Sequence, residues 1–521
     1  MDSPGRNAYN AFASIGRKFN VQSTARDILR RLKYAGLLFA VIPAFAQAPS
    51  DVAVRVDWNH PLLTSKTTAT LQVVVNPLLE RASPIHDAVF ANLKSLGADY
   101  VRYVPWLPYP KLAVAEMEPP TKTTTSWDFS RIDPMTTDFL DATAGHPVIV
   151  NFSTSPAWLY KTPKPVPYPA NPDDVDWDYT QGTQLIDPSG KQLGDYYARL
   201  VDWYTNGGFI DENGKRHDSG HHYPIAYWEV GNEVDSEHQT TAEDYTRHYD
   251  AIVAAIRKDN PKMKFVGLAL ADPSSHPEMF EYFLNPANHK PGIPLDMISY
   301  HFYATPSAGQ TVSDWQYTFF DQAERFLSTV RYIESIRKRL SPETRTTLDE
   351  IGSILPGDPG TPGKAEKPIS PYYWQLSGAL YADVYLETVK LGIDVVGESQ
   401  LVGYPSQFPS VTLLDWTTGA PNARFAVLQL IKSNFSAGDT VVDVKQDSSA
   451  IAALGFVHDG RRKLLLVNKR NRSMRLELPP EFSHGEVSGV QSSRNGATVQ
   501  TYRASSTTLM LDPFAVIVVA Q

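Results

Sequence analysis

Cysteine is absent from all 521 positions of the sequence. Disulfides, thiolate metal sites and cysteine nucleophiles are therefore excluded, although this absence does not identify the compartment. The chain also lacks an excess of basic residues: 48 Lys and Arg residues against 57 Asp and Glu residues give a net charge of −9. The basic residues form no long block. Since nucleic-acid binding depends on many phosphate contacts, nucleic acid is not an expected partner.

Several catalytic motifs are also missing. The chain has no G-x-S-x-G elbow, no G-x-G-x-x-G fingerprint, no Walker A loop and no H-E-x-x-H sequence. These absences exclude the usual serine-hydrolase, dinucleotide, nucleotide and zinc-protease chemistries, and no cofactor is expected. His217, His221 and His222 have a spacing that suggests a metal, but they lie in a Gly-rich turn before a strand, which favours a surface loop. We therefore expect no metal.

What remains is an ordinary globular composition with two excesses. Hydrophobic residues are 42% and charged residues 20%, which fits a folded chain of two to four domains or one large barrel with an accessory domain. Proline, at 40 residues, exceeds its usual share of about 5%. Aromatic residues make up 11%. Stiff loops and flat apolar surfaces are expected.

The N-terminus carries a targeting signal. The basic residues Arg30, Arg31 and Lys33 precede the apolar run Gly36–Pro43 and then Ala44-Phe45-Ala46. This order is typical of a secretory signal peptide, and the run is short for a membrane span. We assign residues 1–46 to a signal peptide or an N-terminal membrane-targeting segment and expect a secreted, periplasmic or extracellular protein.

Eight short β-rich runs alternate with amphipathic helical stretches between residues 71 and 435. Strands buried on both faces that alternate with helices predict a (β/α)₈ barrel, an α/β fold. The eight predicted strands are Leu71–Val75, Asp99–Val104, Pro147–Phe152, Ile225–Glu233, Lys264–Ala269, Asp296–Tyr303, Thr346–Ile351 and Asp394–Gln400. The insertions Pro105–Thr125 and Ser153–Gly194 follow strands and are rich in Pro, Trp and Tyr. Loops after strands line the face where barrel enzymes place their sites, so they should wall in a cleft.

A second pattern, of short strands and turns, covers residues 436–521 and predicts a C-terminal all-β sandwich. Its predicted strands are Val441–Val444, Ala450–Val457, Lys463–Val467, Met474–Leu478, Ala497–Tyr502 and Thr508–Leu511. Residues 47–70 contain the strand-like segment Asp51–Lys66, which we expect to pack on this β-domain. The sequence does not indicate an oligomeric state.

Two carboxyl-bearing motifs fall at strand ends. Tyr227-Trp228-Glu229-Val230-Gly231-Asn232-Glu233 ends the fourth predicted strand, and Thr346-Thr347-Leu348-Asp349-Glu350-Ile351-Gly352 ends the seventh. Period-2 alternation places Asp349 and Glu350 on opposite faces, so one of them faces the barrel axis. Strands four and seven lie across a closed barrel, so their ends can present two carboxyl groups to one bond, as retaining glycosidases require.

Together these motifs resemble clan A retaining glycoside hydrolases. The resemblance rests on Asn232-Glu233, on His301-Phe302-Tyr303 of strand six, on Glu350 and on Arg102 of strand two. The run Trp127–Asp133 resembles a sequence of glycoside hydrolase family 39. The glycine before Asn232, in Trp228-Glu229-Val230-Gly231-Asn232-Glu233, resembles families 51 and 79 instead.

The resemblance implies a role for each matching residue. Glu233 would be the general acid/base and Glu350 the nucleophile; Asn232 would bind the sugar 2-hydroxyl. Arg102 would pair with Glu350, Tyr303 would hydrogen-bond Glu350, and His301 would line the same subsite. Apart from the resemblance, Glu229 and Asp349 are both expected to be structural carboxylates, and Asp349 is also the fallback nucleophile.

The end of strand eight departs from the clan. The clan usually has a Trp there as a sugar platform, but this chain has Gly397-Glu398-Ser399-Gln400. We expect the platform to pass to Trp106, Trp158 or Trp374, and Glu398 and Gln400 to contact a polar or charged feature of the substrate.

The sequence therefore predicts a metal-independent retaining glycosidase acting on O-glycosidic bonds of β-linked sugars in an oligosaccharide, polysaccharide or glycoside. Xyloside-like substrates and exo action are favoured. The alternatives are a non-catalytic carbohydrate-binding barrel, a β-glucuronidase-like enzyme and a transglycosylating enzyme.

Overall fold

A computed structural model describes residues 51–521 except 178, 180, 308, 357, 359–368, 404–407 and 495. The predicted export segment, residues 1–46, lies outside the described residues. Within the described ranges, no helix combines the length and the apolar character that crossing a membrane would need.

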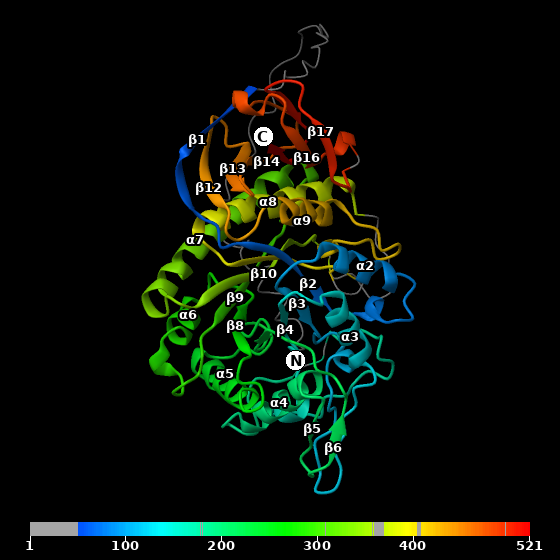
Figure 1. Cartoon of the computed structure of the whole chain (residues 1–521). Coiled ribbons are helices and arrows are strands. Elements are labelled where there is room, and N and C mark those ends of the chain that lie inside the picture. Colours follow the sequence, from blue (N-terminus) through cyan, green and yellow to red (C-terminus); the bar gives the residue numbers. More distant parts are fainter. Residues whose placement is uncertain are drawn as a thin grey trace, which may run out of the picture.

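Eight parallel strands close into a barrel in the order β10-β11-β2-β3-β4-β7-β8-β9 (Figure 1). Their bounds are β2 Thr68–Val74, β3 Val101–Val104, β4 Val148–Val150, β7 Tyr227–Glu229, β8 Lys264–Leu270, β9 Met297–Ala304, β10 Arg345–Ser353 and β11 Val395–Glu398. Each predicted barrel strand overlaps one of these strands, so the predicted (β/α)₈ barrel is confirmed. The signal was strong because strands buried on both faces are apolar along their whole length.

Helices follow the strands and cover the outside of the barrel (Figure 1). They are α2 His86–Leu96, α3 Ile132–Ala142, α4 Lys191–Thr205, α5 Ala242–Ile256, α6 Pro277–Phe283, α7 Trp315–Leu340, α8 Pro371–Leu391 and α9 Ala423–Asn434. Their ends follow local chemistry: the Thr241 side chain caps α5 by accepting from Asp244 N, and Gly392 ends α8 in the left-handed region. The 3₁₀ turns are η3 Pro77–Leu79, η4 Pro110–Leu112, η5 Ala157–Leu159, η6 Pro286–Asn288, η7 Val312–Asp314, η8 Pro409–Val411, η9 Pro480–Phe482 and η10 Ser492–Arg494.

Strand β10 contains an irregularity that matters for the site. Thr347 pairs with Ser299 of β9, but the next paired residue, Glu350, faces His301. Three steps along β10 therefore match two along β9, and the same mismatch recurs against β11. An extra residue of this kind is a β-bulge, and it breaks the alternation of side chains between the two faces.

The C-terminal strands and β1 form one nine-stranded sheet in the order β17-β16-β19-β14-β13-β12-β1-β15-β18. Strand β1, Asp51–Thr64, pairs antiparallel with β12 along most of its length and parallel with β15 through its first residues. The other bounds are β12 Thr440–Gln446, β13 Ile451–His458, β14 Arg461–Asn468, β15 Met474–Glu477, β16 Glu486–Val490, β17 Gln500–Arg503, β18 Thr508–Leu511 and β19 Val516–Ala520. Sequence analysis predicted the all-β character but missed β16 and β19.

Two hydrophobic cores meet in this sheet. One lies between its curled layers and contains Val52, Leu466 and Ile517. The other is the barrel core, which continues through α8 and α9 to the opposite face of the sheet, where Phe456 and Val518 join it. In Figure 1, α8 and α9 lie between the sheet and the barrel.

A small hairpin, β5 Gly208–Ile210 and β6 Arg216–Asp218, contains His217, and His221 and His222 follow it in the chain. His217 contacts Asp211 at 2.8 Å, and His221 contacts Asp133 at 3.1 Å. His217 and His221 thus contact two different carboxylates.

Candidate active site

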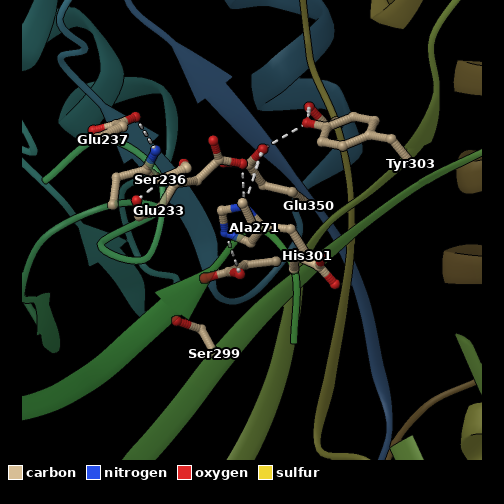
Figure 2. Close-up of polar contacts among 12 residues, drawn as sticks. Glu233, Ser236, Glu237, Ala271, Ser299, His301, Tyr303 and Glu350 are labelled. Atoms are coloured by element: carbon tan, nitrogen blue, oxygen red, sulfur yellow. Dashed lines mark hydrogen bonds and ion pairs between the residues drawn. The ribbon is translucent and has the colours of Figure 1, made fainter. Parts of the chain in front are cut away.

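Glu233, His301 and Glu350 meet at the carboxyl ends of the barrel strands (Figure 2). Glu233 follows β7, His301 lies in β9 and Glu350 lies in β10. One ligand atom from each of the three residues lies within 4.8 Å of the others. The two predicted catalytic glutamates thus come from barrel strands four and seven, and their carboxyl groups approach closely.

Arg102, in β3, connects the residues around Glu350. Its guanidinium is fully buried and donates from Nη1 to Glu350 Oε1 at 2.5 Å, and from Nη2 to Asn232 Oδ1 at 2.7 Å. Its Nε donates to Glu229 Oε2 at 2.5 Å. The fork geometry of arginine lets one cation orient three groups at once. The Arg102–Glu350 pair implied by the family resemblance is present.

Both carboxylates of the β10 motif face the barrel interior. Arg102 Nε lies 3.3 Å from Asp349 Oδ2, while its Nη1 contacts Glu350. The prediction that only one of them faces the axis is wrong, because the bulge in β10 rotates two consecutive side chains to the same face.

Tyr303 and His301 complete the surroundings of the glutamates. The Tyr303 hydroxyl donates to Glu350 Oε2 at 2.5 Å and lies 2.7 Å from Ser399 Oγ. His301 Nδ1 lies 3.0 Å from Glu233 Oε1 and 3.6 Å from Glu350 Oε2. His301 therefore contacts both carboxyl groups through the same nitrogen (Figure 2).

The two glutamates have opposite pKa shifts. Burial raises the pKa of Glu233, and the nearby Glu350 charge adds to this against the opposing contact with His301. Burial also acts to raise the pKa of Glu350, but the charges of His301 and Arg102 and the Tyr303 hydrogen bond outweigh it, so that this pKa lies below its usual value. The two environments thus favour the protonated form of Glu233 and the ionised form of Glu350, the split that an acid and a nucleophile require.

His301 itself is poised to carry charge. Burial acts to lower its pKa, but Glu350, Glu233 and Asp349 raise it to about 9. At neutral pH the imidazolium form dominates and balances the carboxylate of Glu350.

Glu229 and Asp349 lie beneath the glutamate pair. Glu229 is buried and accepts from Arg102, from Ser299 Oγ at 2.5 Å and from Asn151 Nδ2 at 2.7 Å. This matches the structural role expected for Glu229. Burial and the Glu229 charge hold the pKa of Asp349 well above its usual value, which favours its neutral form.

Sequence reasoning missed three polar residues of this network. Gln72 accepts from Arg102 Nη1 at 2.8 Å and donates to Ser399 Oγ at 2.6 Å. Asn151 is the second, and Glu237 is the third: Glu237 Oε1 accepts from Asn232 Nδ2 at 2.8 Å and from Trp106 Nε1 at 2.6 Å. Gln72 and Asn151 were readable as polar residues at or near the ends of strands one and three. Glu237 was signalled by its spacing of four from Glu233.

The aromatic residues expected to form a platform have different places. Trp106 reaches the site through Glu237 and packs against Trp177 and Phe408, with ring centroids 5.6 and 6.2 Å away. Trp158 donates its indole N–H to Glu116 O within the loops after β3 and β4. Trp106 is therefore the candidate that the structure joins to the glutamates.

Glu398 does not face the cleft. Its side chain is fully buried and pairs with Arg424 of α9, Nε to Oε1 at 2.9 Å. The predicted contact between Glu398 and substrate is therefore corrected: the side chain points to the helical layer, where Arg424 compensates its charge. Gln400 is also buried, at 2% exposure, and its backbone N–H donates to Val411 O.

Among the described residues, one group has a spacing that would suit a metal ion: Glu233, His301 and Glu350. Arg102 and Tyr303 each donate to a different oxygen of Glu350, and His301 contacts Glu233. These protein partners already engage the group, in an arrangement suited to proton transfer.

Two family profiles match parts of the chain. Residues 179–326 match the alpha-L-arabinofuranosidase 1 domain. Residues 448–519 match the D-apionate lactonase C-terminal immunoglobulin-like domain. The first match contains Asn232, Glu233, His301 and Tyr303 but ends before Glu350, and the second contains none of the site residues. No curated protein sequence matches the chain.

Solved structures share the fold over nearly the whole described chain. A GH51 arabinofuranosidase from Xanthomonas axonopodis pv. citri has 13% identity and a TM-score of 0.63, covering 90% of this chain and 99% of its own. The alpha-L-arabinofuranosidase from Thermotoga maritima has 13% identity, a TM-score of 0.59 and the same coverage. A GH30 endoxylanase from Clostridium papyrosolvens C71, also 13% identical with the same coverage, has a TM-score of 0.54.

These neighbours define a class by architecture. The chain has the barrel-plus-β-domain fold of glycoside hydrolases, and families 51 and 30 are among its structural neighbours. The expected clan A fold is thus supported, whereas the closer resemblance to family 39 stays a prediction.

Proposed function

We propose that this protein is an exo-acting retaining glycoside hydrolase that cleaves β-linked sugars by double displacement. Glu350 attacks the anomeric carbon while Glu233 protonates the leaving oxygen, so that the bond from carbon to aglycone breaks as the glycosyl-enzyme ester forms. Glu233, now a carboxylate, takes a proton from water; the water oxygen then attacks the same carbon and releases Glu350.

The observation that carries this proposal is the placement of the two carboxyl groups. Their closest oxygen atoms lie within 4.8 Å, and His301 Nδ1 contacts an oxygen of each. Retaining enzymes place the two groups about 5–5.5 Å apart, whereas inverting enzymes leave about 6.5–9.5 Å for a water molecule. The raised pKa of Glu233 and the lowered pKa of Glu350 support the same assignment of acid and nucleophile.

The loops after β3 and β4 support exo action. Asp176 N donates to Pro108 O at 2.8 Å, and Lys111 Nζ donates to Ala170 O at 3.0 Å. The two insertions thereby brace each other above the barrel ends. A wall of this kind closes one end of a cleft and favours removal of a terminal sugar.

Two substrate classes are favoured. The sequence motifs favour β-xylosides and related β-glycosides. The alpha-L-arabinofuranosidase domain match over residues 179–326 includes Glu233 and favours α-L-arabinofuranosides as a second candidate. Because Glu398 is buried away from the cleft, it gives no argument against an anionic sugar, and β-glucuronides belong in the test.

The test is a panel of aryl glycosides that includes β-xyloside, β-glucoside, β-glucuronide and α-L-arabinofuranoside. We expect turnover of at least one compound and a loss of about 10⁴-fold in Glu350→Gln. Proton NMR should show that the first-formed sugar keeps the configuration of the substrate. Sugar binding without turnover would instead identify a non-catalytic barrel, and transfer to a second sugar in place of water would identify a transglycosylase.

A polysaccharide assay tests exo action separately. Release of single sugars from chain ends is expected, while a rapid fall in viscosity would reveal cleavage at internal bonds and contradict the walled cleft.

A further inference from the structure

A tight turn follows Glu233. Both Ser236 N and Glu237 N donate to Glu233 O, at 2.8 and 2.7 Å. The second bond spans four residues, as in one turn of an α-helix, and residues four apart in such a turn project to the same side. The turn therefore brings the Glu237 side chain back beside Glu233, where Figure 2 shows it.

Glu237 connects Asn232, which precedes Glu233, to Trp106. One oxygen, Oε1, accepts from Asn232 Nδ2 at 2.8 Å and from Trp106 Nε1 at 2.6 Å. The other, Oε2, is buried and has no hydrogen-bond partner among the described residues. A buried polar atom without a partner is costly, so its retention needs an explanation.

The Asn232 amide is thereby held at both ends. Arg102 Nη2 donates to its oxygen at 2.7 Å, and its nitrogen donates to Glu237. With a guanidinium N–H at its oxygen and an accepting carboxyl oxygen at its nitrogen, the amide loses both of these bonds if it rotates by 180°. The Asn232 amide nitrogen carries a second N–H besides the one that Glu237 accepts.

We propose that Glu237 is a positioning residue that fixes the Asn232 amide and the Trp106 indole, and so sets how strictly the site requires a sugar 2-hydroxyl. This inference rests on the proposed glycosidase function, because it concerns the hydroxyl that Asn232 would bind. Hydrogen bonds to the 2-hydroxyl strengthen in the transition state of glycoside hydrolysis, so the orientation of the donor affects rate more than ground-state binding.

The protonation state of Glu237 fits this role. Burial, followed by the charge of Glu233, raises its pKa to about 8. At neutral pH the proton resides on Oε2, since Oε1 accepts two N–H groups. A neutral acid can hold Asn232 and Trp106 without adding a second full negative charge beside Glu233.

The experiment compares two substrates that differ by one hydroxyl. Wild type, Asn232→Ala, Glu237→Ala and Glu237→Gln are each assayed with the best aryl glycoside of the panel and with its 2-deoxy analogue. The quantity measured is the ratio of kcat/KM for the two substrates, which cancels changes that affect both equally. Glu243→Gln, an exposed carboxyl group in the first turn of α5, is the matched control.

We expect Glu237→Ala to lower this ratio about 10–100-fold, mainly through kcat, because an oriented donor of this kind contributes on that order. Glu237→Gln keeps an acceptor for both N–H groups and should restore the ratio to within about threefold of wild type. Asn232→Ala should lower the ratio at least as far as Glu237→Ala, and the double variant no further. Glu243→Gln should leave the ratio unchanged.

A ratio that stays at the wild-type value in Glu237→Ala, or an equal loss for both substrates, would overturn the inference. If Glu237→Ala does not fold, as judged by thermal unfolding, Glu237→Leu keeps the side-chain volume and answers the same question. Absence of turnover in wild type would reject the proposed function itself, whereas normal turnover with an unchanged ratio rejects only the role of Glu237.

Discussion

His301 Nδ1 lies 3.0 Å from Glu233 Oε1. The same nitrogen lies 3.6 Å from Glu350 Oε2, so one imidazole affects the ionisation of both predicted catalytic groups. Its pKa of about 9 makes it a cation at neutral pH.

Replacement of His301 should therefore shift the pH profile. In His301→Asn the cation that lowers the pKa of Glu350 and of Glu233 is lost, so both pKa values rise. Activity needs ionised Glu350 and protonated Glu233, so both limbs of the bell-shaped profile of kcat/KM should move to higher pH. We also expect kcat to fall by about 10–100-fold. An unchanged profile would show that His301 does not control these groups.

Asp349 and Glu350 can be distinguished by amide substitution. Because burial and the Glu229 charge raise the pKa of Asp349 and favour its neutral form, Asp349→Asn should lower kcat by no more than about tenfold, whereas Glu350→Gln should lower it by about 10⁴-fold. Steady-state kinetics on one activated aryl glycoside suffices. The reverse order of effects would make Asp349 the nucleophile.

Glu233→Ala should show a leaving-group dependence. With an alkyl or poorly activated aryl leaving group, kcat/KM should fall about 10²–10⁴-fold because protonation of the leaving oxygen is lost. With a dinitrophenyl leaving group, which departs without a proton, the loss should be small. Added azide should attack the glycosyl-enzyme and give a glycosyl azide with the configuration of the substrate. Equal losses for both leaving groups would place the acid elsewhere.

Arg424 and Glu398 provide a stability prediction. Removal of one partner of a buried ion pair leaves an uncompensated charge, and Arg424→Leu should lower the free energy of unfolding by about 3–5 kcal/mol. Glu398→Gln should cost less, and the double variant should recover part of the loss of Arg424→Leu. Denaturant unfolding measures all three.

The same pair has a pH signature. Burial raises the pKa of Glu398 to about 7, so the folded state favours the protonated carboxyl group and this stabilisation is lost as pH rises through about 7. Loss of Arg424 raises that pKa further, so the defect of Arg424→Leu should be larger at pH 8 than at pH 5. Glu398→Gln should keep the wild-type KM, because its side chain lies outside the cleft.

The barrel could be predicted from the sequence because its strands are apolar on both faces and end in recognisable polar motifs. Asn232-Glu233 and Glu350 could be selected as candidates because barrel enzymes place their sites at the carboxyl ends of strands. Arg102 and Tyr303 came with the resemblance and make contacts with Glu350. Strand β19, with five apolar residues, was readable but missed.

The remaining features depend on geometry that a one-dimensional pattern does not carry. Alternation predicted opposite faces for Asp349 and Glu350, but a bulge, which depends on pairing with β9 and β11, puts both on the same face. Glu237 enters the site only because the backbone turns after Glu233. Glu398 lies at the end of the eighth barrel strand, where a substrate contact was expected. Its side chain instead pairs with Arg424 of α9, 26 residues later.

Strand β1 has a consequence for how the chain is made. Val56 pairs with Val444 and Val52 with Leu476, although these partners emerge from the ribosome several hundred residues later. While the barrel is being synthesised, β1 therefore has no strand to pair with, and Val52 and Val54 lack their core partners. An unpaired strand of this kind can pair with other chains. The nine-stranded sheet can therefore form only after its C-terminal strands have been made. It joins the first described strand, β1, to the last, β19.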